Sequence, residues 1–161
     1  MSRHESVKPN GAKNRATILV GTDFSRPARH ALVQALSLAP ERDAGVLLLH
    51  VIHAPDLEVL ARLAEVPEDV LRERLVRERR ERLVELIAEV DDRIGEVPVE
   101  TMLAWGHPYE VILKKASESD VSLIVLGTSG RSADLERALF GSTAEKVLRS
   151  APCPVLCVPT E

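Results

Sequence analysis

Short apolar segments alternate with amphipathic ones along this chain, and the alternation constrains the fold more than any other feature. The most apolar segment is Gly45–Ile52, GVLLLHVI, in which nearly every residue is hydrophobic. This pattern is typical of a strand that is buried on both faces of a parallel sheet. We expect further strands at Thr17–Gly21, Val97–Ala104, Val121–Gly127 and Pro154–Val158.

Helical patterns fill the intervals between these expected strands. Ser25 is a suitable N-cap, Pro27 fits a first helical turn, and apolar residues then recur at helical spacing until Pro40. The longest helix is expected to begin at Pro67 and to end before Gly95. Two more are expected, one directly after Gly106-His107-Pro108 and one over Thr143–Ala151.

The order βαβαβαβαβ predicts an α/β fold: one doubly wound open sheet of five parallel strands, with helices on both faces. With a strand order of 3-2-1-4-5, the first and fourth strands are neighbours at the point where the winding reverses. Ligands of such sheets bind beyond the carboxyl ends of these strands. Asp23 and Gly127 both fall there. Residues 1–15 are polar and aperiodic, so we expect a disordered tail followed by a single domain over residues 16–161.

Composition excludes several classes of function. The chain of 161 residues is 45% hydrophobic, enough for one core, but only 2% aromatic and carries a net charge of −4. DNA or RNA binding is therefore not expected. No apolar run approaches the ~20 residues of a membrane span, and the first residues lack the apolar centre of a signal peptide. We expect a cytoplasmic protein.

The two cysteines are expected to be small core residues. Cys153 and Cys157 lie four positions apart in an expected strand, which separates their Cα atoms by about 13 Å. This distance is too long for an intramolecular disulfide.

A glycine motif follows the fourth expected strand. Ser122–Ser142, SLIVLGTSGRSADLERALFGS, contains Gly127-x-x-Gly130 and then Gly141-Ser142 at the head of an amphipathic helix. Glycines allow close backbone approach to a phosphate, and a helix N-terminus presents N–H groups to an anion. Two alternatives stay open at this point. The glycines could simply turn the chain, and Ser142 with Glu145 could form a capping box that satisfies the same N–H groups without a ligand.

Candidate catalytic and metal-binding residues are few. His50 and His53 are three positions apart, so a strand sends them to opposite faces and they are not expected to share a metal. His107 is expected to cap a helix or to face solvent, and the serines near the glycines show no triad pattern. Asp23 could accept hydrogen bonds from a ribose or base, support a metal ligand, or simply cap a turn.

The run Arg77–Arg82, RERRER, lies within the longest expected helix. Such a run usually forms a solvated face with ion pairs between residues i and i+4. A surface that docks a partner is the alternative.

From Ala16 to Pro159 the chain resembles the universal stress protein family. The resemblance rests on ILVGTDFS, on LLLHVI, on Gly106-His107-Pro108 and on VLGTSGRS together with GSTAEKVLRSAPCPVLCVP. It implies a nucleotide-binding domain that holds ATP, with Mg²⁺ or Mn²⁺ bridging the phosphates. The phosphates would lie at Gly127, Gly130, Gly141 and Ser142. The nucleoside would be held by Asp23 and the backbone around Val51. The other candidate binding residues are Gly21, Thr22, Leu126, Arg131 and Thr143.

The resemblance also implies a homodimer built through Pro154–Val158, together with an unidentified protein partner. One departure from the family pattern is the segment between Gly130 and Gly141, which has ten residues where the family usually has nine. The extra residue could be absorbed in a looser turn or could move Gly141 and Ser142 away from the phosphates.

These observations predict an ATP-binding stress-response regulator or chaperone-like partner rather than an enzyme. Hydrolysis should be slow at most, because no P-loop lysine is present and Arg131 is the only cation next to the glycine turn. One alternative is a nucleotide-independent dimeric interaction module of the same fold. A weaker alternative is a phosphotransferase-type enzyme.

Overall fold

The computed structural model describes residues 15–53, 57–118, 120–128 and 141–159. The strands are β1 (Ala16–Thr22), β2 (Ala44–Ile52), β3 (Val99–Trp105), β4 (Val121–Gly127) and β5 (Val155–Val158). The helices are α1 (Arg26–Leu38), α2 (Leu57–Leu63), α3 (Glu68–Glu89), α4 (Asp91–Ile94), α5 (Pro108–Glu118) and α6 (Ser142–Ser150), and a 3-10 turn covers Pro40–Arg42.

The strands form one five-stranded sheet in the order β3-β2-β1-β4-β5. All four pairs are parallel, and β1 lies in the middle, with Leu19 opposite Leu47 of β2 and Ile124 of β4. The expected fold class and strand order are confirmed. Because β1 and β4 are neighbours, the reversal of winding lies between them.

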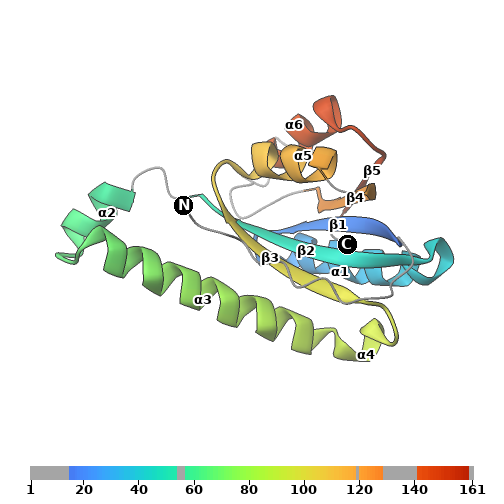
Figure 1. Cartoon of the computed structure of the whole chain (residues 1–161), viewed down its shortest axis with the longest axis horizontal. Coiled ribbons are helices and arrows are strands. Elements are labelled where there is room, and N and C mark those ends of the chain that lie inside the picture. The colour runs from blue at the N-terminus through green and yellow to red at the C-terminus, as the bar shows by residue number, and fades with distance from the viewer. Residues whose placement is uncertain (1–14, 54–56, 119, 129–140, 160–161) are drawn as a thin grey trace.

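Helices cover both faces of the sheet (Figure 1). Ile18 and Val20 of β1 point into a core formed with α1 and α3, whereas Leu19 points into a second core formed with α5 and α6. All three side chains are fully buried. This alternation on a strand buried on both faces explains why the strand segments are apolar at nearly every position.

The helical region after β2 differs most from the expected pattern. The helix expected from Pro67 to Gly95 is divided at Val90 into α3 and α4, and the short helix α2 precedes it, where we expected no element. The third strand begins at Val99 rather than Val97, because the N–H of Val97 donates to the carbonyl of Ile94 in a turn (2.9 Å). Cys153 lies before β5 rather than within it, and both cysteines are half-buried free thiols.

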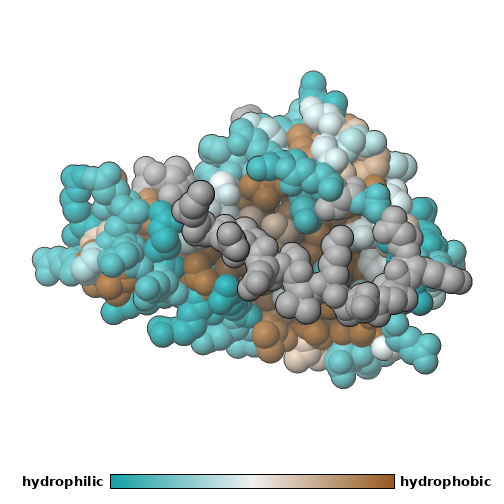
Figure 2. Space-filling view, viewed as in Figure 1, coloured by the Kyte–Doolittle hydropathy of each residue, from teal (hydrophilic) through white to brown (hydrophobic). Residues whose placement is uncertain are grey.

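Helix α2 and the first turns of α3 extend beyond the carboxyl ends of β2 and β3 (Figure 1). Hydrophilic residues predominate on the surface of this projecting part (Figure 2). Val59, Leu60 and Leu63 of α2 are nevertheless exposed. None of the helices in the described ranges is both long and apolar enough to cross a membrane.

Gly127, the last residue of β4, allows α1 to approach the sheet closely. A Cβ atom at this position would lie 2.7 Å from the carbonyl carbon of Pro27, a distance that backbone atoms cannot tolerate. A Cβ at Gly45, at the start of β2, would instead lie 3.4 Å from the nearest atom, the carbonyl oxygen of Pro98. The two glycines therefore differ in what a side chain would meet.

We expect Gly127→Ala to lower the free energy of unfolding by about 1–3 kcal/mol, the usual effect of overpacking. Gly45→Ala is the matched control and should change stability much less, since its methyl group meets only ordinary contacts. Urea unfolding of the two variants beside the wild type measures both effects. Equal losses in the two variants would show that the contact with Pro27 is not the constraint.

Candidate functional site

The candidate site lies at the carboxyl ends of β1, β2 and β4. Val20 lies opposite Val125, so Thr22 and Gly127 each follow two residues later at the same edge of the sheet. Thr22 also lies opposite His50 of β2, one residue before Val51. The strand order thus brings together the expected positions on β1, β2 and β4.

The turn between β1 and α1 is held by short-range hydrogen bonds. The hydroxyl of Thr22 accepts a hydrogen bond from the N–H of Phe24 (3.1 Å), and the carboxylate of Asp23 accepts one from the N–H of Ser25 (3.0 Å). The Ser25 hydroxyl then caps α1 by accepting from the N–H of Ala28 (3.4 Å). Phe24 has a φ of 64°, which is uncommon for a residue other than glycine. Asp23 therefore occupies a fixed turn immediately after the strand.

His50 attaches this turn to β2. Its Nδ1 donates to the carbonyl oxygen of Thr22 at 2.7 Å, and because a carbonyl only accepts, Nδ1 carries the proton. The imidazole is buried, and its centroid lies 4.3 Å from that of Phe24. Burial lowers the pKa of His50, and the charge of Arg79 acts in the same direction, while the hydrogen bond to Thr22 opposes the shift. His50 is thus a neutral positioning residue beneath the Asp23 turn.

The other side of the site is formed by the end of β4 and the start of α6. The N–H of Thr128 donates to the carbonyl of Val158 (3.0 Å), which continues the ladder with β5. The carbonyl of Thr128 accepts a hydrogen bond from the N–H of Gly141. This bond places the N-terminus of α6 beside the end of β4. Gly130 and Arg131, the other expected residues of the glycine turn, lie outside the described residues.

The capping box considered for α6 is not formed. Gly141 is the N-cap, in an extended conformation, and no described side chain caps the helix. Ser142 lies inside the first turn, and the Glu145 carboxylate pairs with Arg149 at 2.8 Å instead of reaching back. The alternative in which Ser142 and Glu145 satisfy the first N–H groups of α6 is therefore wrong.

The expected binding residues differ in what they can present to a ligand. Thr22, Val51 and Leu126 are buried, and the last two belong to the core under α5 and α6, so their contribution would come from the backbone. Gly21 lies in β1, where an added Cβ would meet the Leu126 side chain. Ser142 is exposed, while Asp23, Gly127, Gly141 and Thr143 are partly exposed.

Two contacts near the site could not be found from the sequence. Nε2 of His53, just after β2, lies 2.9 Å from Nδ1 of His107, between β3 and α5. The guanidinium of Arg82 on α3 lies 4.4 Å from the centroid of Phe24. Each contact joins segments far apart in the chain, and no local pattern marks them. Over the described ranges, no group of three or more His, Cys, Asp or Glu side chains is arranged to hold a metal ion.

The comparison with known proteins agrees with this architecture. The family model described as the universal stress protein family matches residues 14–159. The chain belongs to the universal stress protein family. A putative universal stress protein of Staphylococcus haemolyticus is 38% identical over 145 residues, which cover 89% of this chain and 84% of the relative.

Solved structures give the same result for the fold of this universal stress protein. A hypothetical protein solved as a test case of structural genomics has a TM-score of 0.76 and 29% identity, covering 92% of this chain and 99% of its own. A universal stress protein of Archaeoglobus fulgidus, solved in complex with dAMP, has a TM-score of 0.64 and 22% identity. The matched region covers 91% of this chain and 99% of the Archaeoglobus fulgidus chain, so the two proteins share a fold.

The lowered pKa of His50 makes the stability of this universal stress protein pH-dependent. The unfolded chain binds a proton at His50 more readily than the folded one, so the free energy of unfolding falls as the pH drops below about 6.5. His50→Asn keeps an N–H donor for Thr22 but does not titrate. We expect a smaller loss of stability on acidification in this variant, measured as urea midpoints on either side of that pH. An equal loss in both proteins would exclude His50 as the source.

Proposed function

We propose that this protein binds an adenine nucleotide, ATP with a bridging divalent ion, and acts as a nucleotide-dependent regulator or chaperone-like partner in the stress response. The observation that carries the proposal is the start of α6. Its N-terminal N–H groups have no side-chain cap among the described residues, and the bond from Gly141 to Thr128 aligns them with the carboxyl end of β4. Helix N-termini in this position bind phosphate groups.

The opposite wall suits the nucleoside. Asp23 is held at the end of β1 by its bond to the N–H of Ser25, and a carboxylate accepts hydrogen bonds from ribose hydroxyls. The backbone around Val51, two strands from β4, would contact the base. Mg²⁺ or Mn²⁺ would be held mainly through the phosphates, as such ions usually are at nucleotide sites. The solved complex of the Archaeoglobus fulgidus relative with dAMP supports an adenine nucleotide as a guest of this fold.

Within this proposal the protein holds ATP rather than turning it over. Rapid phosphoryl transfer needs a positioned base together with cationic charge on the γ-phosphate. Asp23 would lie at the nucleoside end, and the sequence has no P-loop lysine. ATP hydrolysis should therefore be far slower than the ~10 s⁻¹ that is typical of enzymes.

Gly141→Val tests the phosphate side of the site. Gly141 has a φ of −65°, which valine adopts without strain, so the helix should still form while the side chain hinders approach to the first N–H groups. We expect calorimetry with Mg-ATP to show an affinity lower by about tenfold or more, because hydrogen bonds to a charged group are each worth about 1.5–3 kcal/mol. Gly45→Ala, at the amino end of β2, is the control and should bind normally.

Two further measurements complete this test. Mass spectrometry of the molecule released from denatured wild-type protein should identify an adenine nucleotide. Absence of nucleotide binding by the wild type would favour a nucleotide-independent interaction module of the same fold. Steady-state ADP release at ~1 s⁻¹ or faster would favour the phosphotransferase reading.

We also propose a homodimer built through β5, which lies at the edge of the sheet. Ile124 donates to the carbonyl of Pro154, and Thr128 donates to that of Val158, so alternate residues of β5 face β4. The backbone groups of Val155 and Cys157 therefore face the open edge, where a second chain can pair.

Val155→Pro should convert the dimer to a monomer, because it removes an N–H donor at the open edge and leaves the ladder with β4 intact. Light scattering at tens of micromolar protein measures the mass. Leu156→Pro is the contrasting variant, since it removes a donor that faces β4 and should destabilise the fold itself. A monomeric wild type, or a Val155→Pro variant that remains dimeric, would contradict this interface.

A further inference from the structure

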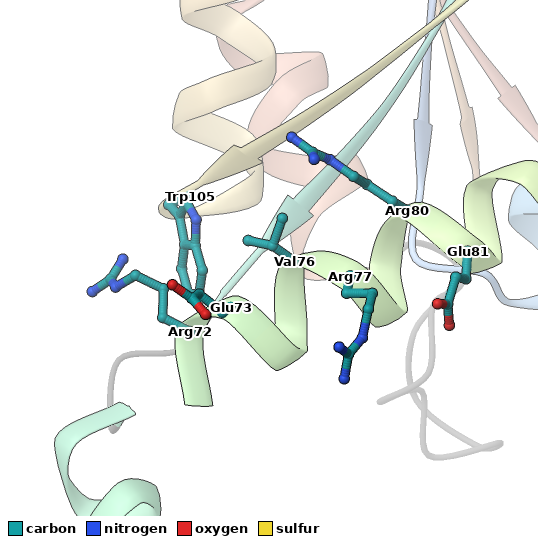
Figure 3. A pocket seen from close by; sticks show the side chains of 7 residues that line it. All are labelled: Arg72, Glu73, Val76, Arg77, Arg80, Glu81 and Trp105. Atoms are coloured by element: carbon teal, nitrogen blue, oxygen red, sulfur yellow. The ribbon is translucent and has the colours of Figure 1, made fainter. Parts of the chain in front are cut away.

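A groove separate from the candidate nucleotide site lies between the middle of α3 and Trp105, the last residue of β3 (Figure 3). Its volume is about 500 Å³, within the range of small-molecule sites. We call it the α3 groove. Trp105 lies opposite Ile52 of β2, so the α3 groove adjoins the candidate nucleotide site at the same sheet edge. The two are distinct in their lining, because no residue of the groove is among the expected nucleotide-binding residues.

The α3 groove combines an apolar surface with positive charge. Val76 and the Trp105 ring provide the apolar part, and Arg72, Arg77 and Arg80 provide the charge. From Arg72 to Arg82 the sequence contains six arginines and three glutamates, a local excess of three positive charges in a chain whose net charge is −4. This segment includes the charged run Arg77–Arg82, for which a surface that docks a partner is one of the two alternatives.

The arginines between Arg72 and Arg82 are not all paired at i and i+4, as they would be on a simple solvated face. Arg72 pairs with Glu68 at 3.1 Å and also places its guanidinium 4.5 Å from the centroid of Trp105. Arg79 pairs with the adjacent Glu78 at 2.6 Å. Arg77 and Arg80 form no ion pair with any residue in the described ranges. In Figure 3 the Arg80 and Val76 side chains both project from α3 toward the strands, whereas the Arg77 side chain projects away from them.

We propose that the α3 groove binds a small aromatic anion, a ligand with a planar ring and a phosphate, sulfonate or carboxylate group. The ring packs against Val76 and Trp105, where offset or edge-to-face contact between rings is favourable. The anionic group meets Arg80, whose planar guanidinium group matches the geometry of such oxyanions, while Arg72 remains stacked on Trp105 and paired with Glu68. Glu73 and Glu81 also line the groove and oppose any anion there. Selectivity therefore requires both parts of the ligand.

Trp105 is the only tryptophan in the chain, so its fluorescence reports directly on the α3 groove. Phenyl phosphate is the probe, inorganic phosphate is the control without a ring, and benzyl alcohol is the control without a charge. We expect phenyl phosphate to change the fluorescence saturably and each control to act much more weakly. The single tryptophan indole N–H signal in a ¹H–¹⁵N spectrum gives an independent measurement and should shift with the same midpoint.

Two substitutions of opposite sign test the electrostatic part. Arg80→Gln should weaken phenyl phosphate binding several-fold, up to about fivefold for an exposed ion pair, and Glu73→Gln should strengthen it by a similar factor. Both residues are exposed, so neither change threatens the fold. Arg149→Gln on α6 removes an equally exposed arginine far from the groove and should have no effect.

The proposal is overturned if benzyl alcohol or inorganic phosphate acts as strongly as phenyl phosphate, or if Arg80→Gln and Glu73→Gln leave the midpoint unchanged. Gly141→Val separates the two sites, because it should impair ATP binding without changing the response of Trp105 to phenyl phosphate. Loss of the phenyl phosphate response in Gly141→Val would assign the probe to the nucleotide site and would also overturn the proposal.

Discussion

The pairing of β1 with β4 is the interaction on which the rest of the structure depends. It joins Thr17–Val20 to residues about a hundred positions later, and the fully buried side chains of Leu19 and Ile124 lie side by side in it. The same pairing creates the reversal of winding and brings the Asp23 turn close to Gly127. Without this register, the first turn of α1 could not rest on Gly127 at the distance that only glycine allows.

Most of the sheet could be predicted because each strand is marked by its own residues. The sequence predicts Val121–Gly127 with the bounds that the structure has, and the rules of connection limit the strand orders that such a chain can adopt. The region from α2 to α4 could not be predicted as well. No proline or glycine marks the break between α3 and α4 at Val90. Helix α2 is short and exposes much of its apolar surface, so its sequence lacks a clear amphipathic pattern.

Some residues of the candidate site could likewise be predicted from the sequence, and others could not. Asp23 and Gly127 could be placed from the sequence because the ends of parallel strands meet at one edge. His50 could not be assigned its role, since its partner is a backbone carbonyl 28 positions away and nothing near His50 in the chain indicates it. The capping box failed for a different reason. Its residue pattern is present, but α6 begins at Ser142 with Gly141 as the N-cap, one position earlier than the box requires.

Charge is distributed unevenly along this chain, and α3 shows how the fold uses it. Arg79 and Arg82 approach the buried His50 from one side, and both lower the pKa of His50. The imidazole tolerates these positive charges because it is neutral and its Nδ1 proton is donated to the carbonyl oxygen of Thr22. The Arg82 guanidinium stacks on the ring of Phe24, which also contacts His50. These two contacts fix the Phe24 ring in the turn that holds Asp23. The basic helix therefore contributes to two surfaces: Arg82 packs against Phe24 in the turn that holds Asp23, while Arg80 lines the groove beside Trp105.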